Sequence, residues 1–150
     1  MASPRDAPTM SEGCLFCRIA DGDLPSRTVY EDEATLAFLD INPLAAGHTL
    51  VVPKAHHEQV GELSPDLAGA LFRAVAAVTP AVEAAADATA STVAINNGEA
   101  AGQEVPHLHV HVVPRHRDDG AGPIHGLFRD VPDLDDDEMD AIEADIRAAL

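Results

Sequence analysis

Hydrophobic residues along the chain form two kinds of pattern: short apolar runs between turn-forming residues, and longer runs with a helical period. Five short runs are typical of strands, at residues 28–30, 35–39, 48–52, 91–95 and 107–114. Short turns separate the first three runs, and such returns favour antiparallel pairing. The pattern therefore predicts an antiparallel sheet of about five strands.

The clearest helical period begins after the third strand. Ser64 suits the N-cap of a helix and Pro65 its first position. The apolar residues that fall on one face of this helix are Leu67, Leu71, Val75 and Val78. Pro80 lacks the backbone N–H that a helix interior uses, so we expect it to bend or break the helix and to leave a second piece over residues 81–88.

Two further helical segments complete the predicted fold. A short turn is expected near residues 14–22, and a final helix over residues 135–149 has acids in its first turn. Together these elements predict an α+β fold, with helices packed on one face of the antiparallel sheet. Residues 1–11 are polar and show no period, so we expect a flexible leader before a single domain over residues 12–150.

The charge balance limits the classes of partner. The chain has 26 acidic and 9 basic residues, a formal net charge of −17. Such a field repels phosphodiester backbones, which argues against a nucleic-acid partner. It would also repel a free nucleotide unless local donors or salt overcome it, so we form the hypothesis of a host with a salty, halophile-like cytoplasm. We see neither a membrane-length apolar run nor a signal core, and so expect no membrane association and a cytoplasmic location.

The run from residue 107 to residue 112 carries the most specific chemistry. On a strand, His107, His109 and His111 share one face, while the intervening apolar residues face the core. A solvent-facing polar strand is one interpretation. A single metal ion held by all three rings is another, although the outer two residues start about 13 Å apart on a strand. We favour a third, in which a neutral imidazole attacks phosphorus and its neighbours stabilise the developing charge.

This histidine run resembles the signature of the histidine triad (HIT) superfamily. The similarity extends over about residues 14–116 and is strongest in five segments: Cys14-Leu15-Phe16-Cys17-Arg18-Ile19, Phe38-Leu39-Asp40-Ile41-Asn42-Pro43, residues 47–56, Asn96-Asn97-Gly98 and residues 102–113. It is most similar to the branch of nucleotide phosphoramidases and related nucleoside-polyphosphate hydrolases. The resemblance implies a purine nucleotide substrate and, for catalysis itself, no cofactor.

The resemblance also implies a role for each histidine of the run. His109 would be the nucleophile, forming a covalent nucleotidyl-histidine that water then hydrolyses. His111 would donate a hydrogen bond to the leaving group or to a phosphate oxygen, and His107 would flank them as the first member of the triad. Adenosine phosphoramidates are the expected substrates. Two alternatives stay open: hydrolysis of diadenosine polyphosphates, and a zinc-stabilised protein that binds nucleotide without turnover.

Residues outside the triad match nucleotide contacts of the family. By this resemblance, Asn96 would contact phosphate, Gln103 occupies the loop before the triad, and Asp40 would accept from the ribose hydroxyls. The apolar slot for the base would be formed by Phe16, Ile19, Phe38 and Ile41. His48 matches a histidine that lines the cleft in relatives. Core packing remains an alternative for Phe16 and Ile19, and a structural role for His48. Glu104 departs from the family, because a hydroxyl residue often stands at this position.

The last two implications concern a metal and a partner. Cys14, Cys17, His56 and His107 resemble the ligands of a structural zinc, and two thiolates with two imidazoles would close a tetrahedral site. Reduced buried thiols and a disulfide are the alternatives for this cysteine pair. Relatives form two-fold dimers that extend the sheet, so a homodimer is expected, with the helix led by Ser64 as the contact element.

Overall fold

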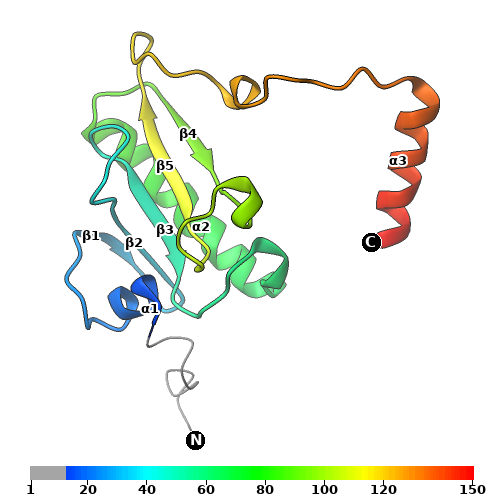
Figure 1. Ribbon diagram of the computed structural model, residues 1–150. Coiled ribbons are helices and arrows are strands. Elements are labelled where there is room, and N and C mark those ends of the chain that lie inside the picture. Colours follow the sequence, from blue (N-terminus) through cyan, green and yellow to red (C-terminus); the bar gives the residue numbers. More distant parts are fainter. Residues whose placement is uncertain (1–12) are drawn as a thin grey trace, which may run out of the picture. The chain divides into compact units, whose positions relative to one another are not determined.

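A computed structural model describes residues 13–150, so the expected leader over residues 1–11 lies outside the described residues. The chain divides into two compact units, one that ends at Asp119 and one over Gly120–Leu150. The first unit contains the whole sheet and all residues of the candidate site (Figure 1). The two units are described separately below.

The first unit is built on a five-stranded antiparallel sheet, which confirms the predicted α+β class. The strands are β1 (Thr28–Glu31), β2 (Thr35–Leu39), β3 (Thr49–Pro53), β4 (Ala90–Ala94) and β5 (Val110–Arg115). Their order across the sheet is β1-β2-β3-β5-β4, and every neighbouring pair is antiparallel. The last strand of the chain, β5, therefore lies between β3 and β4, and β4 forms one edge of the sheet.

The fifth strand begins later than the sequence pattern predicts, at Val110 and not at residue 107. The reason is a set of competing backbone contacts. Leu108 N donates to His57 O at 2.6 Å, and His107 N donates to Val105 O at 2.8 Å. These bonds tie the first two residues of the expected strand to neighbouring loops, so they do not join the ladder of the sheet.

The long helix α2 (Pro65–Ala85) is continuous, so the prediction that Pro80 would divide it is wrong. Proline removes one intrahelical bond and costs about 3 kcal/mol in a helix interior. Val78 and Val82 lie on either side of Pro80 and are both buried in the core, and full burial of such a side chain stabilises by roughly 1.5–3 kcal/mol. Packing against the sheet therefore offsets the local cost of the proline.

Alternation along the strands gives the sheet two apolar faces. Ala37, Val51 and Val110 point to the face covered by α2, whose own residues there include Leu71 and Val75. The opposite face carries a second set: Leu36, Phe38, Leu50 and Val52, together with Cys14, Phe16 and Cys17 in and before α1 (Leu15–Ala20). We expected helices on one face only. The structure instead places α1 on the face opposite α2, where it helps to form the candidate site.

By length and mean hydropathy, 1.4 in its most apolar stretch, α2 also resembles a membrane-spanning helix. Its Leu71, Val75 and Val82 are nevertheless buried in the α2 side of the core. A core helix of this kind is apolar because it is packed against the sheet.

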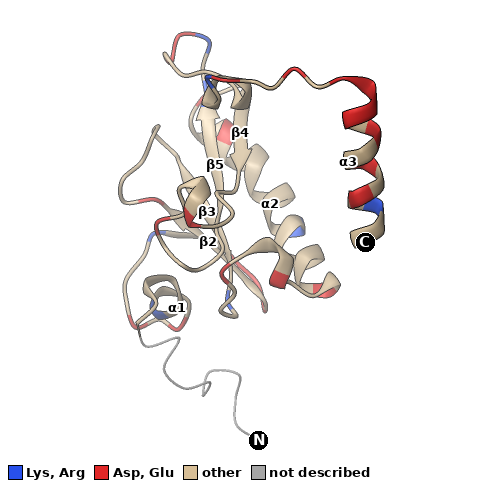
Figure 2. Ribbon diagram, turned by 45° about the vertical axis from the view of Figure 1, so that its right-hand side comes forward, with Lys and Arg blue, Asp and Glu red and all other residues tan. Residues whose placement is uncertain are grey.

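The second unit contains the short turn η4 (Ile124–Leu127) and the helix α3 (Asp136–Ala149), which confirms the predicted final helix. Asp135 caps α3, because its side chain accepts from Glu138 N at 2.9 Å and Glu138 reaches back to Asp135 N at 2.9 Å. Figure 2 shows acidic residues along this helix and the segment before it. The acids of the first turn are favourably placed at the positive end of the helix dipole.

Candidate active site and metal centre

A cleft of about 890 Å³ opens on the α1 face of the sheet. Its size lies within the usual range of ligand pockets, roughly 300–1,000 Å³. Apolar residues from α1, β2 and β3 form one part of the lining, among them Phe16, Ile19, Phe38, Ile41 and Leu50. The polar and charged residues of the lining include Asp40, His48, Asn96, Glu104, His109 and His111. The cleft therefore combines an apolar slot with groups that can bind a phosphorylated sugar.

His109 is nearly buried, with 8% of its surface exposed, and its ring is fixed on one side. Its Nδ1 lies 2.8 Å from the backbone carbonyl of His107. A carbonyl can only accept, so Nδ1 carries a proton, and the neutral form of the ring has its lone pair on Nε2. Phe16 contacts the ring edge to face, with 5.1 Å between ring centroids. The structure thus engages Nδ1 of His109 with the backbone and leaves Nε2 as the nitrogen that can act as a nucleophile in the wall of the cleft.

His111 and His48 form a hydrogen-bonded pair beside this nucleophile. His48 Nε2 lies 2.9 Å from His111 Nδ1, and His48 Nδ1 accepts from Leu44 N at 3.0 Å. Burial, with smaller contributions from the neighbouring His109 and His48, lowers the pKa of His111 to about 4. Burial also lowers the pKa of His48, against the opposing effect of Asp40. Both rings are therefore neutral near pH 7.

Asp40 places a carboxylate at the rim of the same cleft. Its Oδ1 accepts from Asn42 N at 2.9 Å, and its Oδ2 lies 3.7 Å from His48 Nδ1. Its backbone N–H donates to His48 O at 3.0 Å, which holds the segment after β2 against the start of β3. The carboxylate keeps acceptor capacity for further donors, such as the two hydroxyls of a ribose.

Gln103, predicted to contact nucleotide, does not line the cleft. Its side chain is occupied by backbone groups instead. Its Oε1 accepts from Gly98 N at 2.8 Å, and its Nε2 donates to Glu58 O at 2.8 Å and to Val105 O at 3.0 Å. These contacts join the loop that carries Asn96 to two other segments, so the geometry gives Gln103 a part in holding the loop.

His107 is separated from the other two histidines of the triad. It is fully buried and does not line the cleft. Its Nε2 lies 2.8 Å from Pro53 O, and its Nδ1 lies 3.3 Å from Cys14 Sγ and 3.4 Å from Cys17 Sγ. The three histidines alternate with Leu108 and Val110, which face α2, as the sequence pattern predicts, but only His109 and His111 line the cleft. His107 supports His109 through its backbone carbonyl and not through its ring.

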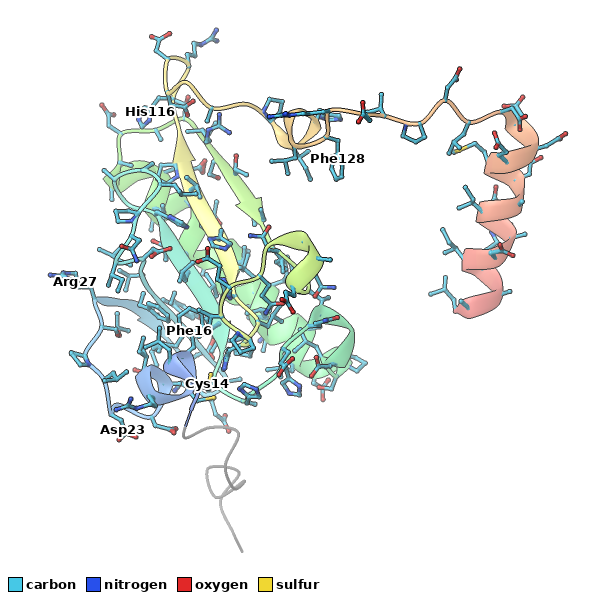
Figure 3. The ribbon with its side chains drawn as sticks, viewed as in Figure 1. Cys14, Phe16, Asp23, Arg27, His116 and Phe128 are labelled. Carbon is cyan, nitrogen blue, oxygen red and sulfur yellow. The ribbon has the colours of Figure 1, made fainter. Side chains whose placement is uncertain are left out.

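Four residues form a compact cluster beside the cleft: Cys14, Cys17, His56 and His107. Their ligand atoms all lie within 4.8 Å of one another, and His56 Nδ1 is 3.3 Å from Cys17 Sγ. Figure 3 shows Cys14 at the start of α1, close to the end of the strands. Both cysteines are free thiols in the structure, so the alternative of a disulfide is not adopted.

The donor set of this cluster fits zinc. Zn–S and Zn–N bonds of about 2.3 and 2.1 Å at tetrahedral angles place sulfur and nitrogen about 3.6 Å apart. The observed 3.3–3.4 Å separations are close to this value. The His107 Nε2–H donates to the Pro53 carbonyl, so the lone pair of Nδ1 points toward the thiols, as in metal-bound histidines. Burial, followed by the contact with Cys14, raises the pKa of Cys17 to about 12, which a bound cation would reverse.

Several lining residues were not predicted from the sequence, among them Arg27 and Leu44. Arg27 precedes β1, is exposed and lines the cleft (Figure 3). The chain has only 9 basic residues against 26 acidic ones, and this scarcity of cations was the signal in the sequence that could have indicated Arg27. Leu44 contributes its backbone N–H to His48. No side-chain pattern could indicate that role.

Comparison with known proteins agrees with this geometry. The HIT domain family matches residues 21–118. A solved HIT family protein from Bacillus subtilis is 40% identical, with a TM-score of 0.83 over 92% of this chain and 97% of its own. A zinc-bound histidine triad family protein from Mycobacterium smegmatis is 36% identical, with a TM-score of 0.70 over 93% of this chain and 99% of its own.

A functionally named relative is adenylylsulfatase HINT3 of Arabidopsis thaliana. It is 36% identical over 110 residues, which are 73% of this chain and 56% of that protein. The matches and the shared fold define a histidine triad protein, and the chain belongs to the HIT family. Nucleotide binding and hydrolysis are the general activities of this family.

Proposed function

We propose that the protein hydrolyses nucleotides at the α-phosphate through a covalent nucleotidyl intermediate on His109. One observation carries the proposal. The Nδ1–H of His109 is held by the His107 carbonyl at 2.8 Å, so the lone pair of the neutral ring lies on Nε2, in a cleft of nucleotide size. Adenosine phosphoramidates are the proposed substrates.

The reaction divides into two displacements at phosphorus. In the first, His109 Nε2 forms a bond to the α-phosphorus while the phosphorus–nitrogen bond breaks, and a proton from the cleft neutralises the leaving amine. The modified imidazole then carries a positive charge, which the His107 carbonyl stabilises through Nδ1–H. In the second, the oxygen of a water molecule forms a bond to phosphorus while the bond from phosphorus to His109 Nε2 breaks, and the proton released by the water replaces the one that the cleft gave to the leaving amine. Splitting one difficult step into two is the general advantage of covalent catalysis.

The remaining lining residues suit the other parts of a purine nucleotide. The apolar walls around Phe16 and Phe38 would receive the base, and the carboxylate of Asp40 would accept from the ribose hydroxyls. Asn96 lines the same cleft and would donate to a phosphate oxygen. Ile41, 79% exposed, would cover the base from the rim.

Two further activities remain candidates. Diadenosine polyphosphates would share the first displacement and differ only in the leaving group. The name of the relative HINT3, an adenylylsulfatase, supports an adenylate as the electrophile without deciding the leaving group. Glu104 lines the cleft where a hydroxyl would assist departure in relatives, and this favours a protein that binds nucleotide without turnover as the alternative.

The test compares His109→Ala with wild type on an adenosine phosphoramidate, a diadenosine polyphosphate and an adenylyl sulfate. We expect the variant to lose hydrolysis by at least about a thousandfold while it retains AMP binding. His116→Ala is the matched control, because His116 is exposed and follows the far end of β5 (Figure 3). Undiminished turnover by His109→Ala would refute the proposal, and AMP binding without any turnover by wild type would favour the binding protein.

We also propose that the cluster of Cys14, Cys17, His56 and His107 holds one structural zinc ion. With four protein ligands the ion would have no open position for substrate, so it would stabilise the fold and take no part in the reaction. Native mass spectrometry of protein purified without chelator should show one zinc per chain, and Cys17→Ala should show none. Apoprotein in both samples would remove the site from the proposal.

A cytoplasmic homodimer is proposed on the basis of the family resemblance. The outer face of α2 supports it, since Phe72 leaves 49% of its surface exposed there. Light scattering on the purified chain should give twice the monomer mass, and Phe72→Glu should shift the protein toward the monomer. A monomeric wild type at micromolar concentration would contradict the dimer.

A further inference from the structure

Glu104 is a carboxylate in the cleft that the proposed reaction does not use. It is exposed and belongs to the lining, together with Asn96, His109 and His111. Among residues 13–150 its side chain has neither a hydrogen bond nor a charged partner. An unpaired acid in a site for a phosphorylated substrate requires an explanation, because it repels the negative charge that the site must hold.

The backbone on both sides of Glu104 is held in place. On one side, the Gln103 side chain accepts from Gly98 N at 2.8 Å and donates to Val105 O at 3.0 Å. On the other side, Val105 O also accepts from His107 N at 2.8 Å, and the Val105 side chain packs against the apolar residues on the α1 face of the sheet. The Glu104 side chain therefore starts from a fixed point, and a ligand need not order this loop.

The sheet order indicates which part of a substrate would meet Glu104. Asp40, proposed to bind the ribose, follows β2, whereas His109, proposed to attack the α-phosphorus, directly precedes β5. A nucleotide bound in this way extends across β3, from the side of β2 toward β5. The loop that carries Glu104 connects β4 to β5 (Figure 1). Beyond the α-phosphate, the leaving group would therefore lie against this loop.

The charges of the cleft do not suit an anionic leaving group. The charged residues of the lining are Arg27, Asp40 and Glu104, so Arg27 is the one fixed cation in the part of the lining that the structure describes. Arg27 leads into β1, and β1 lies three strand spacings from β5, about 14 Å. Burial lowers the pKa of both His48 and His111, so these rings add no positive charge near pH 7. A sulfate or polyphosphate leaving group would face the Glu104 carboxylate without a cation to offset it.

We propose that Glu104 is a specificity-determining residue that selects phosphoramidates whose leaving amine carries a second, positively charged amino group, as in a nucleotide joined to a diamine or polyamine. The inference rests on the proposed function of the cleft. The distal ammonium donates a charge-assisted hydrogen bond to the Glu104 carboxylate. Its charge also offsets that of the phosphate, so the chain, with a net charge of −17, repels such a substrate less than an anionic one.

A role for Glu104 as a general base toward the attacking water is the competing interpretation. A base acts on the second displacement, which is common to all substrates with the same nucleotide, so its loss would lower kcat for each of them alike. Selection of a cationic leaving group acts only where the substrate carries that charge, and it appears mainly in KM because the ion pair is already formed in the bound substrate. The two roles therefore differ in their dependence on the leaving group.

The kinetic test uses three adenosine phosphoramidates of alkyl amines of one length, which end in an ammonium, a methyl or a carboxylate group. Attraction of one charge and repulsion of the other, each worth roughly threefold to fivefold at an exposed site, should give wild type a kcat/KM for the ammonium compound about tenfold or more above that for the carboxylate compound. Glu104→Gln keeps the size of the side chain and removes the charge, so the ratio should fall below about threefold, mainly through KM.

Glu99→Gln is the matched control, because Glu99 is an exposed acid of the same loop that does not line the cleft. This variant should keep the wild-type ratio. Added KCl should reduce the ratio in wild type, since the charge pair is exposed. Equal kcat/KM for the three compounds in wild type, or the same ratio in Glu104→Gln as in wild type, would overturn the proposal. An equal fall in kcat for all three compounds in Glu104→Gln would overturn it in favour of the general base.

A binding test separates this inference from the proposed function. Calorimetric titration of His109→Ala with the same three compounds needs no turnover, and the ammonium compound should bind most tightly. Adding Glu104→Gln to this variant should make the three affinities equal to within about threefold. Equal affinities in His109→Ala itself would overturn the inference even if wild type is active. The expected order of affinities, found with a wild type that hydrolyses none of the compounds, would support the inference and refute only the proposed function.

Discussion

Replacing Gln103 should destabilise the fold because its side chain links three backbone segments. Its amide oxygen accepts from Gly98 N at 2.8 Å, and its amide nitrogen donates to Glu58 O at 2.8 Å and Val105 O at 3.0 Å. Gln103→Ala removes all three bonds. Gln103→Glu keeps an acceptor for Gly98 but sets a carboxylate against the two carbonyl oxygens.

The bonds set the size of the effect. Three bonds with a net contribution of about 0.5–1.5 kcal/mol each give roughly 1.5–4.5 kcal/mol for Gln103→Ala. Gln103→Glu should cost a similar amount or more, because two acceptors lose their donor and face a negative charge. Asn96 lies in the same loop as Gly98. Loss of the bond to Gly98 should therefore loosen Asn96 and raise KM for nucleotide in both variants.

Urea denaturation of both variants measures the change in the free energy of unfolding, and AMP titration measures binding. Glu99→Gln is the matched control, because Glu99 is exposed and lies in the same loop, and its expected change is below about 0.5 kcal/mol. A Gln103→Ala protein with wild-type stability but weakened AMP binding would refute the reasoning, because it would indicate a direct contact with nucleotide.

Two further predictions concern stability. The pKa of His111 is about 4 in the folded protein, whereas its ordinary value is 6.5. As pH falls, the unfolded chain therefore binds a proton at His111 before the folded protein does. The free energy of unfolding should decline from pH 6.5 toward pH 4. Solvent on the cleft side reduces this contribution to the free energy of unfolding to roughly 2 kcal/mol. Denaturation curves at about pH 7 and about pH 4.5 measure it, and the His111→Asn variant should lack this part of the pH dependence. Leu108 is fully buried in the α2 side of the core, so Leu108→Ala should lower the free energy of unfolding by about 3–4 kcal/mol, and a loss below about 1 kcal/mol would contradict that packing.

Much of the sheet could be predicted because its strands are bounded by local turn residues and have apolar faces. The features that failed depend on contacts between distant segments. The start of β5 is delayed by a bond from Leu108 N to His57 O, and α2 continues through Pro80 because its valines are packed on the sheet. Neither contact has a local signature.

The candidate site shows the same division. Alternation correctly places the three histidines on one side, and family resemblance indicates most of the residues that line the cleft. Alternation gives the face of a side chain but not its direction along the strand, so the separation of His107 from the other rings was not predicted. The engagement of Gln103 by backbone groups was also hidden, since one partner, Glu58, is 45 residues away.

His107 connects the cysteine pair to the nucleophile of the cleft. Its ring faces the thiols of Cys14 and Cys17, while its carbonyl, only a few bonds away, holds the ring of His109. Any oxidation or alkylation that forces those sulfurs apart will therefore reorient the carbonyl as well. Damage to the cysteine pair should therefore reach the nucleophile through the backbone of His107, without passing through the cleft.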